Sequence, residues 1–178
     1  MRSEVFMAGT GGQGVLLIGQ LLTQAASEMG LQVSYFPIYS PEVRGGSTTC
    51  TVVVSDGVVG SPISGRPASM LLMDQFSVNA NVARLRDGGL AVVNATLVRE
   101  IPRENLRLLW IPATDQAVAI GNDRIANMVM LGAYVGATGV VSMAAVEHAL
   151  KTVLPERHHK YLPLNTQALR AGAELAST

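Results

Sequence analysis

A glycine-rich run near the start of the chain carries the clearest chemical signal in the sequence. The segment GTGGQG places Gly9, Gly11 and Gly14 at the spacing G-x-G-x-x-G. A short apolar run at residues 5–8 precedes it, and apolar residues at helical spacing follow from Val15. A glycine turn that leads into a helix presents free backbone N–H groups and a partial positive charge. We therefore expect this turn to be able to hold an anion.

The same spacing occurs in dinucleotide-binding turns, but the rest of that fingerprint is missing. A dinucleotide site needs an acidic residue about 20 residues further on, at the end of the second strand, to hold the ribose hydroxyl. The corresponding segment, VSYFPI at residues 33–38, contains no Asp, Glu or Arg. A tight turn for close helix–sheet packing explains the glycines without any ligand, although it leaves the role of Gln13 open.

A second glycine-containing loop, SPEVRGGS, follows the next predicted strand. Pro41 stiffens this loop, whereas Gly45 and Gly46 free its far end. If the first two strands are parallel and adjacent, both loops lie at the edge of the sheet where ligands bind in open α/β folds. Arg44 can there bind a carboxylate or phosphate of a ligand or a partner chain. Alternatively, Glu42 and Arg44 pair with each other in solvent.

The other reactive side chains in the sequence do not form a familiar catalytic set. His158 and His159 are adjacent, a spacing that does not converge on a metal from one helix face, so we expect a solvated pair. His148 is expected on the exposed side of a helix. Cys50 is the single cysteine and falls in an alternating strand pattern, which predicts a core or edge thiol without an internal disulfide.

Alternating strands and helices are expected to position these groups. Beyond the first strand, strand patterns cover residues 31–39, 48–55, 70–73, 90–94 and 106–111. The dipeptide Asp56-Gly57 is a strong hairpin signal, so we expect Val58 and Val59 to begin an antiparallel return strand and the sheet to be mixed. Residues 112–114 are expected to turn the chain out of the last strand.

Helical patterns account for much of the remaining chain. They cover residues 15–29, 75–85, 125–137, 143–154 and 165–175. The third is apolar nearly all round, so we expect it to be buried, with Gly132 and Gly136 letting another helix approach closely. Ser142 is placed to cap the fourth. The pattern predicts a single three-layer α/β/α domain over residues 1–178, with a mostly parallel, mixed sheet of the Rossmann or flavodoxin-like kind.

Composition limits the partners. Of the 178 residues, 48% are hydrophobic and only 15% are charged, which suits a subunit that buries part of its exterior. Lys plus Arg and Asp plus Glu are both 13, so no basic field recruits nucleic acid or anionic lipid. No secretory leader is recognisable, and no apolar run reaches the roughly 18 residues of a membrane span. We expect a cytoplasmic protein whose partners are neither nucleic acid nor membrane.

Four segments, in order and at similar spacing, resemble one enzyme family. They are GTGGQGV from Gly9, YSPEVRGG from Tyr39, VSDGVVGSP from Val54 and NMVMLGA from Asn127. Together they are similar to the gamma subunit of the 2-oxoacid:ferredoxin oxidoreductases, over nearly the whole chain. The paired GGQG and PE-x-RGG motifs carry most of the specificity. The gamma domain of that family is an α/β/α unit, which agrees with the fold expected from the residues.

The resemblance implies a subunit of an oxidoreductase complex that is inactive alone. In this family, alpha and beta subunits bind thiamine diphosphate with Mg and decarboxylate a 2-oxoacid. The acyl group passes to coenzyme A, and electrons leave through iron–sulfur clusters to ferredoxin. The implied partners are the alpha and beta subunits and a small ferredoxin-like subunit, in a hetero-oligomer whose dimerisation stays open. With one cysteine, this chain ligates no such cluster itself.

The lack of a fused ferredoxin portion and the chain length favour the 2-oxoglutarate type of this family. Pyruvate, branched-chain and aryl-pyruvate types remain alternatives. A stand-alone nucleotide- or acyl-CoA-binding α/β module without redox activity is the alternative from a different class of function.

The family motifs predict one functional edge, with no catalytic residue and no metal ligand. This edge is expected to dock against the alpha or beta subunit near the coenzyme A and thiamine sites. Arg44 is the expected charged contact and Gln13 a neutral hydrogen-bonding one. The predicted edge comprises Gly11, Gly12, Gln13, Gly14, Pro41, Glu42, Arg44, Gly45 and Gly46.

Overall fold

Six strands form one sheet that lies between helices. The computed structural model describes residues 1–39, 46–60 and 65–177. The strands are β1 (Arg2–Thr10), β2 (Gln32–Tyr39), β3 (Ser47–Ser55), β4 (Ser69–Leu72), β5 (Leu90–Asn94) and β6 (Arg107–Ile111). The α-helices are α1 (Val15–Glu28), α2 (Gln75–Asn81), α3 (Ala113–Ile120), α4 (Ala126–Thr138), α5 (Met143–Val153) and α6 (Leu162–Ala176). Short 3-10 helices are η1 (Val82–Arg84), η2 (Asp123–Ile125) and η3 (Glu156–Tyr161).

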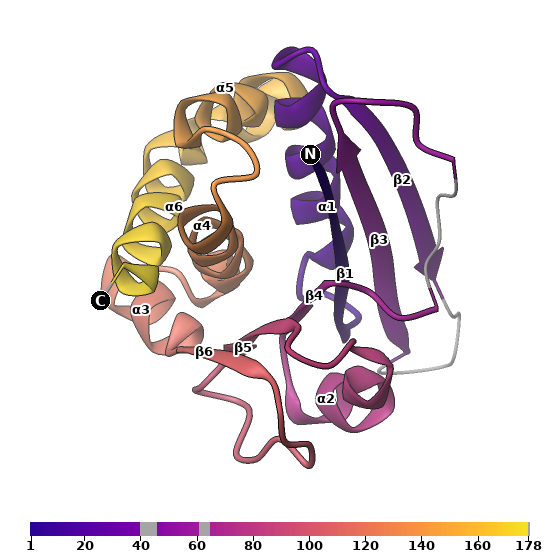
Figure 1. Ribbon diagram of the computed structural model, residues 1–178. Coiled ribbons are helices and arrows are strands. Elements are labelled where there is room, and N and C mark those ends of the chain that lie inside the picture. The colour runs from indigo at the N-terminus through magenta and orange to yellow at the C-terminus, as the bar shows by residue number, and fades with distance from the viewer. Residues whose placement is uncertain (40–45, 61–64, 178) are drawn as a thin grey trace.

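The sheet is mixed, with β1 inside it. The strand order is β2-β3-β1-β4-β5-β6. β4, β5 and β6 extend the sheet in parallel from one side of β1, whereas β3 pairs with β1 antiparallel on the other side. Helices α1 and α3 to α6 pack on one face and α2 lies on the other (Figure 1). The predicted α/β class with a mostly parallel, mixed sheet is confirmed.

β1 is apolar on both of its faces because helices cover both. Val5 and Met7 belong to the large core under α1 and α3 to α6. Phe6 and Ala8 point to the opposite face and join a smaller core with α2. Side chains of successive strand residues alternate between faces, so a continuous apolar run is what a strand in the middle layer requires.

One condition on the first two strands is met only in part, and one expected strand does not form. β2 runs in the same direction as β1, but β3 lies between them, so the two are not adjacent. Residues 58–60 form no return strand after Asp56-Gly57. β3 is already paired along its length with β1 on one side and β2 on the other, so it has no free edge to offer Val58 and Val59. The sheet is mixed because of β3 itself.

The helical layer is centred on α4, which is buried from Ala126 to Val135 as its all-round apolar pattern predicts. α6 crosses it closely at glycine positions on both helices. A Cβ atom at Gly132 would collide with the backbone carbonyl of Leu169, and one at Gly172 with the backbone carbonyl of Val129. The expected close approach at Gly132 and Gly136 is confirmed, since a Cβ at Gly136 would lie 2.9 Å from the Cα of Ala173.

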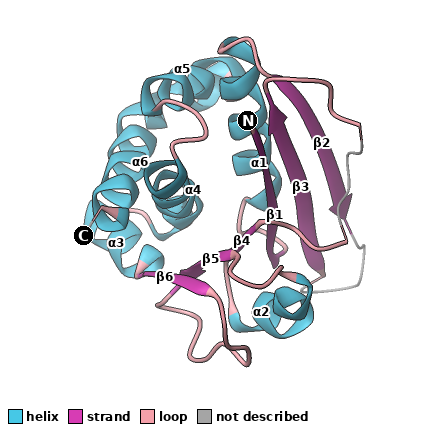
Figure 2. Cartoon of the chain, viewed as in Figure 1, coloured by secondary structure: helices cyan, strands magenta, loops and turns pink. Residues whose placement is uncertain are grey.

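The helix α3 was missed in the sequence. It begins at Ala113, where residues 112–114 were expected only to turn the chain. The helix is short, and its apolar residues cover barely two turns, which gives a weak periodic signal. By contrast, Ser142 caps α5 as expected, accepting a hydrogen bond from the backbone N–H of Ala145. The view by element type shows α3 between β6 and the helical layer (Figure 2).

No helix in the described part of the chain is long and apolar enough to cross a membrane.

Replacing Gly132 by alanine is expected to lower the free energy of unfolding by about 1–3 kcal/mol, because the added methyl must push α6 away from α4. Urea unfolding followed by circular dichroism measures the change. Gly60→Ala is the matched control, since a Cβ at Gly60 meets no atom within 4 Å. Equal stability of the two variants would contradict the close crossing.

Candidate functional site

The glycine turn after β1 is held by hydrogen bonds to its first residue. The backbone N–H of Thr10 donates to Oε1 of Gln13 over 2.8 Å and to Oδ2 of Asp74 over 3.2 Å. The side-chain carbonyl oxygen of Gln13 therefore stabilises the turn in which Gln13 itself lies. The sequence left this role open. Its amide Nε2 has no hydrogen-bond partner among the residues that the structure describes. This nitrogen is the part of Gln13 that remains able to bind another molecule.

The glycines of GTGGQG are required for different reasons. A Cβ at Gly9 would lie 2.6 Å from Oε1 of Gln13, and one at Gly14 would collide with the side-chain amide of Asn127. Gly12 and Gly14 have φ angles of 90° and 72°, in the left-handed region that side chains disfavour. Only Gly11 has neither requirement, because its Cβ would meet no atom closer than 3.8 Å. Close packing thus accounts for much of the dinucleotide-like spacing.

The turn leads directly into α1, whose first residues present free N–H groups. The N-cap residue is Gly14, which has no side chain to cap them. The first helical hydrogen bond within α1 runs from the N–H of Ile18 to the carbonyl of Gly14. The N–H groups of the first turn therefore keep the partial positive charge that favours an anion.

The loop that precedes β3 contacts the glycine turn through Gly46, which is among the described residues. The backbone N–H of Gly11 donates to the carbonyl of Gly46 over 3.0 Å. Pairing of Thr10 with Ser47 in the β1–β3 ladder brings these residues together, although β1 and β2 are not neighbours. The other predicted members of this edge, Pro41, Glu42, Arg44 and Gly45, lie outside the described residues.

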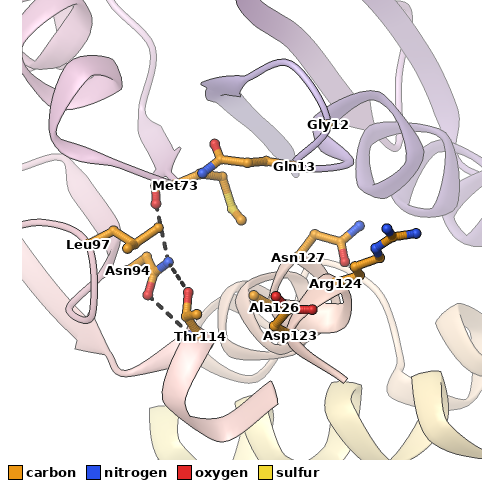
Figure 3. Close-up of a pocket in the computed structure, with 10 residues that line it drawn as sticks. All are labelled: Gly12, Gln13, Met73, Asn94, Leu97, Thr114, Asp123, Arg124, Ala126 and Asn127. Carbon is orange, nitrogen blue, oxygen red and sulfur yellow. Dashed lines mark hydrogen bonds between the residues drawn. The ribbon is translucent and has the colours of Figure 1, made fainter. Parts of the chain in front are cut away.

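A pocket of about 210 Å³ opens at this end of the parallel strands (Figure 3). It lies where the chain leaves β1 toward α1 on one face and β4 toward α2 on the other. Such a point, where connections diverge to opposite faces, is the usual ligand position in open α/β sheets. The lining residues are Gly12, Gln13, Met73, Asn94, Leu97, Thr114, Asp123, Arg124, Ala126 and Asn127.

Asn94 forms the floor of this pocket and ties three elements together. It is fully buried at the end of β5. Its Nδ2 donates to the carbonyl of Met73 and to Oγ1 of Thr114, and its Oδ1 accepts from the backbone N–H groups of Thr96, Ala113 and Thr114. Figure 3 shows Asn94 joined to Thr114 and Met73 in this way. All of its hydrogen-bonding capacity serves the structure, so Asn94 positions the pocket and does not bind a ligand.

Arg124 supplies positive charge beside the turn, although it belongs to none of the motifs recognised in the sequence. Its guanidinium is exposed and has no acidic partner in the described part of the chain, and it extends away from the carboxylate of Asp123 (Figure 3). Asn127 links α4 to the turn by donating from Nδ2 to the carbonyl of Gly14 over 3.2 Å. The signal that could have indicated Arg124 is the polar cluster NDR at residues 122–124, which precedes an apolar helix.

The histidines and the cysteine lie away from this pocket. Cys50 is buried, as expected, and burial raises the pKa of its thiol to about 12, so the thiol stays protonated at neutral pH. His148 is exposed and bonds to Glu28 over 2.8 Å, and hydrogen bonds from Gln24 and then His148 lower the pKa of that carboxyl. His159 is only partly exposed, since its Nε2 lies 2.9 Å from the carbonyl of Leu154, whereas His158 is in solvent.

These side chains do not fit a metal centre. Within the described ranges, no group of three or more His, Cys, Asp or Glu residues could hold an ion. An iron–sulfur cluster needs several thiolates, and the one thiol of this chain is buried against the carbonyl of Val15. No step of a reaction is therefore assigned to a metal in this chain.

Comparison with known proteins identifies the family. The pattern of the family Pyruvate ferredoxin/flavodoxin oxidoreductase matches residues 4–175. The chain belongs to this family. The 2-oxoglutarate synthase subunit KorC of Methanothermobacter marburgensis is 37% identical over 183 residues, covering 98% of this chain and 97% of KorC. The gamma subunit of a keto/oxoacid ferredoxin oxidoreductase from Geobacter sulfurreducens has a solved structure that is 33% identical and superposes with a TM-score of 0.86, covering 98% of both chains.

Other family members are longer. The ketoisovalerate oxidoreductase subunit VorA of Methanothermobacter marburgensis is 36% identical over 97% of this chain, but the chain spans only 36% of the length of VorA. The resemblance to the gamma subunits of this family that the four sequence segments indicated is confirmed.

Replacing Asn94 by leucine is expected to lower the free energy of unfolding by about 1–3 kcal/mol, because the buried N–H groups of Ala113 and Thr114 lose their acceptor. Denaturant titration measures the loss. Asn79→Leu, an exposed position on α2, is the control and should change stability little. If Asn94→Leu were as stable as the control, Asn94 would not hold these elements together.

Proposed function

We propose that this chain is the gamma subunit of a multi-subunit 2-oxoacid:ferredoxin oxidoreductase whose substrate is 2-oxoglutarate. The observation that carries the proposal is the full-length correspondence with KorC, at 37% identity over nearly all of both chains. The proposal also treats residues 1–178 as one gamma-type domain.

The proposed complex decarboxylates 2-oxoglutarate, joins the remaining acyl group to coenzyme A and passes a pair of electrons to ferredoxin. Carbon dioxide leaves, and the thiol proton of coenzyme A is released. The chemistry of the carbanion and of the electrons belongs to thiamine diphosphate, Mg and iron–sulfur clusters, which we place on the alpha, beta and ferredoxin-like partner subunits. The residues of this chain described above fit none of these groups.

The role proposed for this chain is to dock and orient. The predicted edge of Gly11 to Gly14, Pro41, Glu42, Arg44, Gly45 and Gly46 would contact the alpha or beta subunit near the coenzyme A and thiamine sites. Support comes from the hydrogen bond between Gly11 and Gly46, the free Nε2 of Gln13 and the uncapped N-terminus of α1. Arg124 adds a second cation to the same end of the sheet, where an anionic group of coenzyme A can bind.

The substrate is tested in the reconstituted complex with coenzyme A and an artificial electron acceptor. We expect reduction of the acceptor with 2-oxoglutarate at a kcat/KM at least about tenfold higher than with pyruvate or ketoisovalerate. A preference for another 2-oxoacid would contradict the proposal that 2-oxoglutarate is the substrate. It would leave the proposed role as a gamma subunit standing. A chain that stays monomeric beside its candidate partners and binds nucleotide tightly would contradict the subunit role itself.

Replacing Arg44 by alanine is expected to weaken assembly or turnover of the complex by about tenfold, as loss of a charge-assisted contact does. Co-purification and steady-state kinetics measure the two effects. Arg86→Ala is the control, because Arg86 precedes β5 at the opposite end of the sheet. Assembly and turnover equal to those of the control would remove Arg44 from the docking edge.

A further inference from the structure

The two outer strands of the sheet, β2 and β6, differ in how their free edges are protected. An edge strand presents unpaired backbone N–H and C=O groups, and proteins protect such edges with proline, with charge or with a covering segment. β2 carries Pro37, whose nitrogen has no hydrogen to donate. β6 ends the sheet at the other side (Figure 1), and its run Leu-Leu-Trp-Ile after Arg107 contains neither proline nor charge. β6 is therefore the less protected edge.

The backbone of β6 directs free hydrogen-bonding groups outward at Leu108 and Trp110. The N–H of Arg107 donates to the carbonyl of Gly89 over 2.9 Å, and the carbonyl of Ile111 accepts from the segment that follows β5. These two residues of β6 therefore face β5. Successive residues of a strand alternate in the direction of their N–H and C=O groups, so Leu108 and Trp110 face away from β5. Each offers one donor and one acceptor to a neighbouring strand.

The side chains of the same two residues form an exposed apolar patch. Leu109 packs against the large core and Ile111 belongs to it, so Leu108 and Trp110 lie on the opposite face of the sheet, the face of α2. α2 does not cover them, since each is 40% exposed and neither belongs to either core. Apolar side chains beside free backbone groups are what binding by strand addition requires.

We propose that β6 pairs antiparallel with β6 of a second copy of this chain, around a two-fold axis at Leu109. In this register Leu108 of each copy lies opposite Trp110 of the other. Both residues face the interface with their backbone groups, so each opposed pair exchanges two N–H···O=C hydrogen bonds. Each tryptophan ring then lies beside a leucine of the other copy, which is a stabilising cross-strand pair. The two six-stranded sheets become one continuous sheet.

Charge complementarity favours a second copy over an unrelated strand. Arg107 begins β6, and Asp115 lies in the first turn of α3, the helix that follows β6. Both are exposed, and neither has an oppositely charged partner within the ranges that the structure describes. Pairing centred on Leu109 places Arg107 opposite Ile111 of the other copy, just before the α3 that carries Asp115. The side chain of Arg107 points to the face on which α3 packs, so the two charges meet, and two-fold symmetry makes this contact twice.

The proposed surface lies away from the edge predicted to dock other subunits. β6 and β2 end the sheet on opposite sides, and β2 is the strand that precedes Pro41 and Arg44 in the sequence. A second copy on β6 therefore leaves β2 and the glycine turn accessible. The pairing is a property of the chain alone, so it holds whichever 2-oxoacid the proposed complex uses.

The test is analytical ultracentrifugation of the full chain, with the fluorescence of Trp110 recorded on the same samples. We expect the mass to rise from one chain to two with a Kd of about 10–100 µM, because five residues on each side make a small interface. Trp110 is the one tryptophan of the chain, so its emission is expected to shift to shorter wavelength over the same concentration range. A chain that stays monomeric up to about 500 µM would overturn the proposal. A dimer that leaves the emission of Trp110 unchanged would do the same.

Two variants disturb the pairing by different means. Trp110→Lys places a charge on the patch, and Leu108→Pro removes an outward N–H without removing a hydrogen bond to β5. Each is expected to raise the Kd at least about tenfold. Ile38→Lys is the matched control, because Ile38 is an apolar residue of the other edge strand and is 50% exposed. If the folded variants dimerise as well as this control, β6 is not the interface.

Exchange of the two charges tests the identity of the occupant. Arg107→Glu alone and Asp115→Arg alone are each expected to weaken the dimer by about tenfold, because each creates a like-charge contact. The double variant is expected to recover most of the parent's affinity. A double variant that binds no better than the single ones would contradict the two-fold pairing. Burial of Trp110 only after another subunit is added, with the chain alone monomeric, would give the edge to that subunit and exclude the second copy.

Discussion

The end of the sheet that carries the candidate site depends on one close approach, between Gly14 and Asn127. Gly14 is the last residue of the turn after β1, and Asn127 is in the first turn of α4, far along the chain. There is no room for a Cβ atom between them, and the amide of Asn127 donates to the carbonyl of Gly14. The N-termini of α1 and α4 are thereby fixed side by side, which aligns two helix dipoles toward the same space.

The polar residues around this contact divide into those that build the site and those that remain available. Asn127, Asp74 and the carbonyl oxygen of Gln13 form their hydrogen bonds with backbone groups. Asn94 bonds with backbone groups and with the hydroxyl of Thr114. The first-turn N–H groups of α1 and the guanidinium of Arg124 remain available to bind another molecule. A rigid frame of satisfied amides that surrounds a few unused donors is the arrangement expected of a preformed binding site.

Much of the fold could be predicted from the sequence because its strands and long helices have strong, unambiguous periods. The buried helix α4 and its glycine contacts follow from the run NMVMLGAYVG alone. The position of β3 between β1 and β2 could not be predicted in this way. Strand order depends on which strand edges remain free, and a local pattern such as Asp56-Gly57 carries no information about free edges. For the site, the glycine turn was evident in the sequence. Arg124 was not evident, because it is an ordinary polar residue until the fold brings it to the pocket.

The order of elements along the chain has a consequence for how the protein is made. α4 is apolar on nearly all sides, and α6, which follows it by more than twenty residues, supplies its closest cover. During synthesis α4 therefore leaves the ribosome before that cover exists. The nascent chain therefore exposes an apolar helix during the time in which α5 and α6 are synthesised. Pausing or truncation in that interval leaves a species prone to chaperone capture or aggregation, while the sheet upstream is already complete.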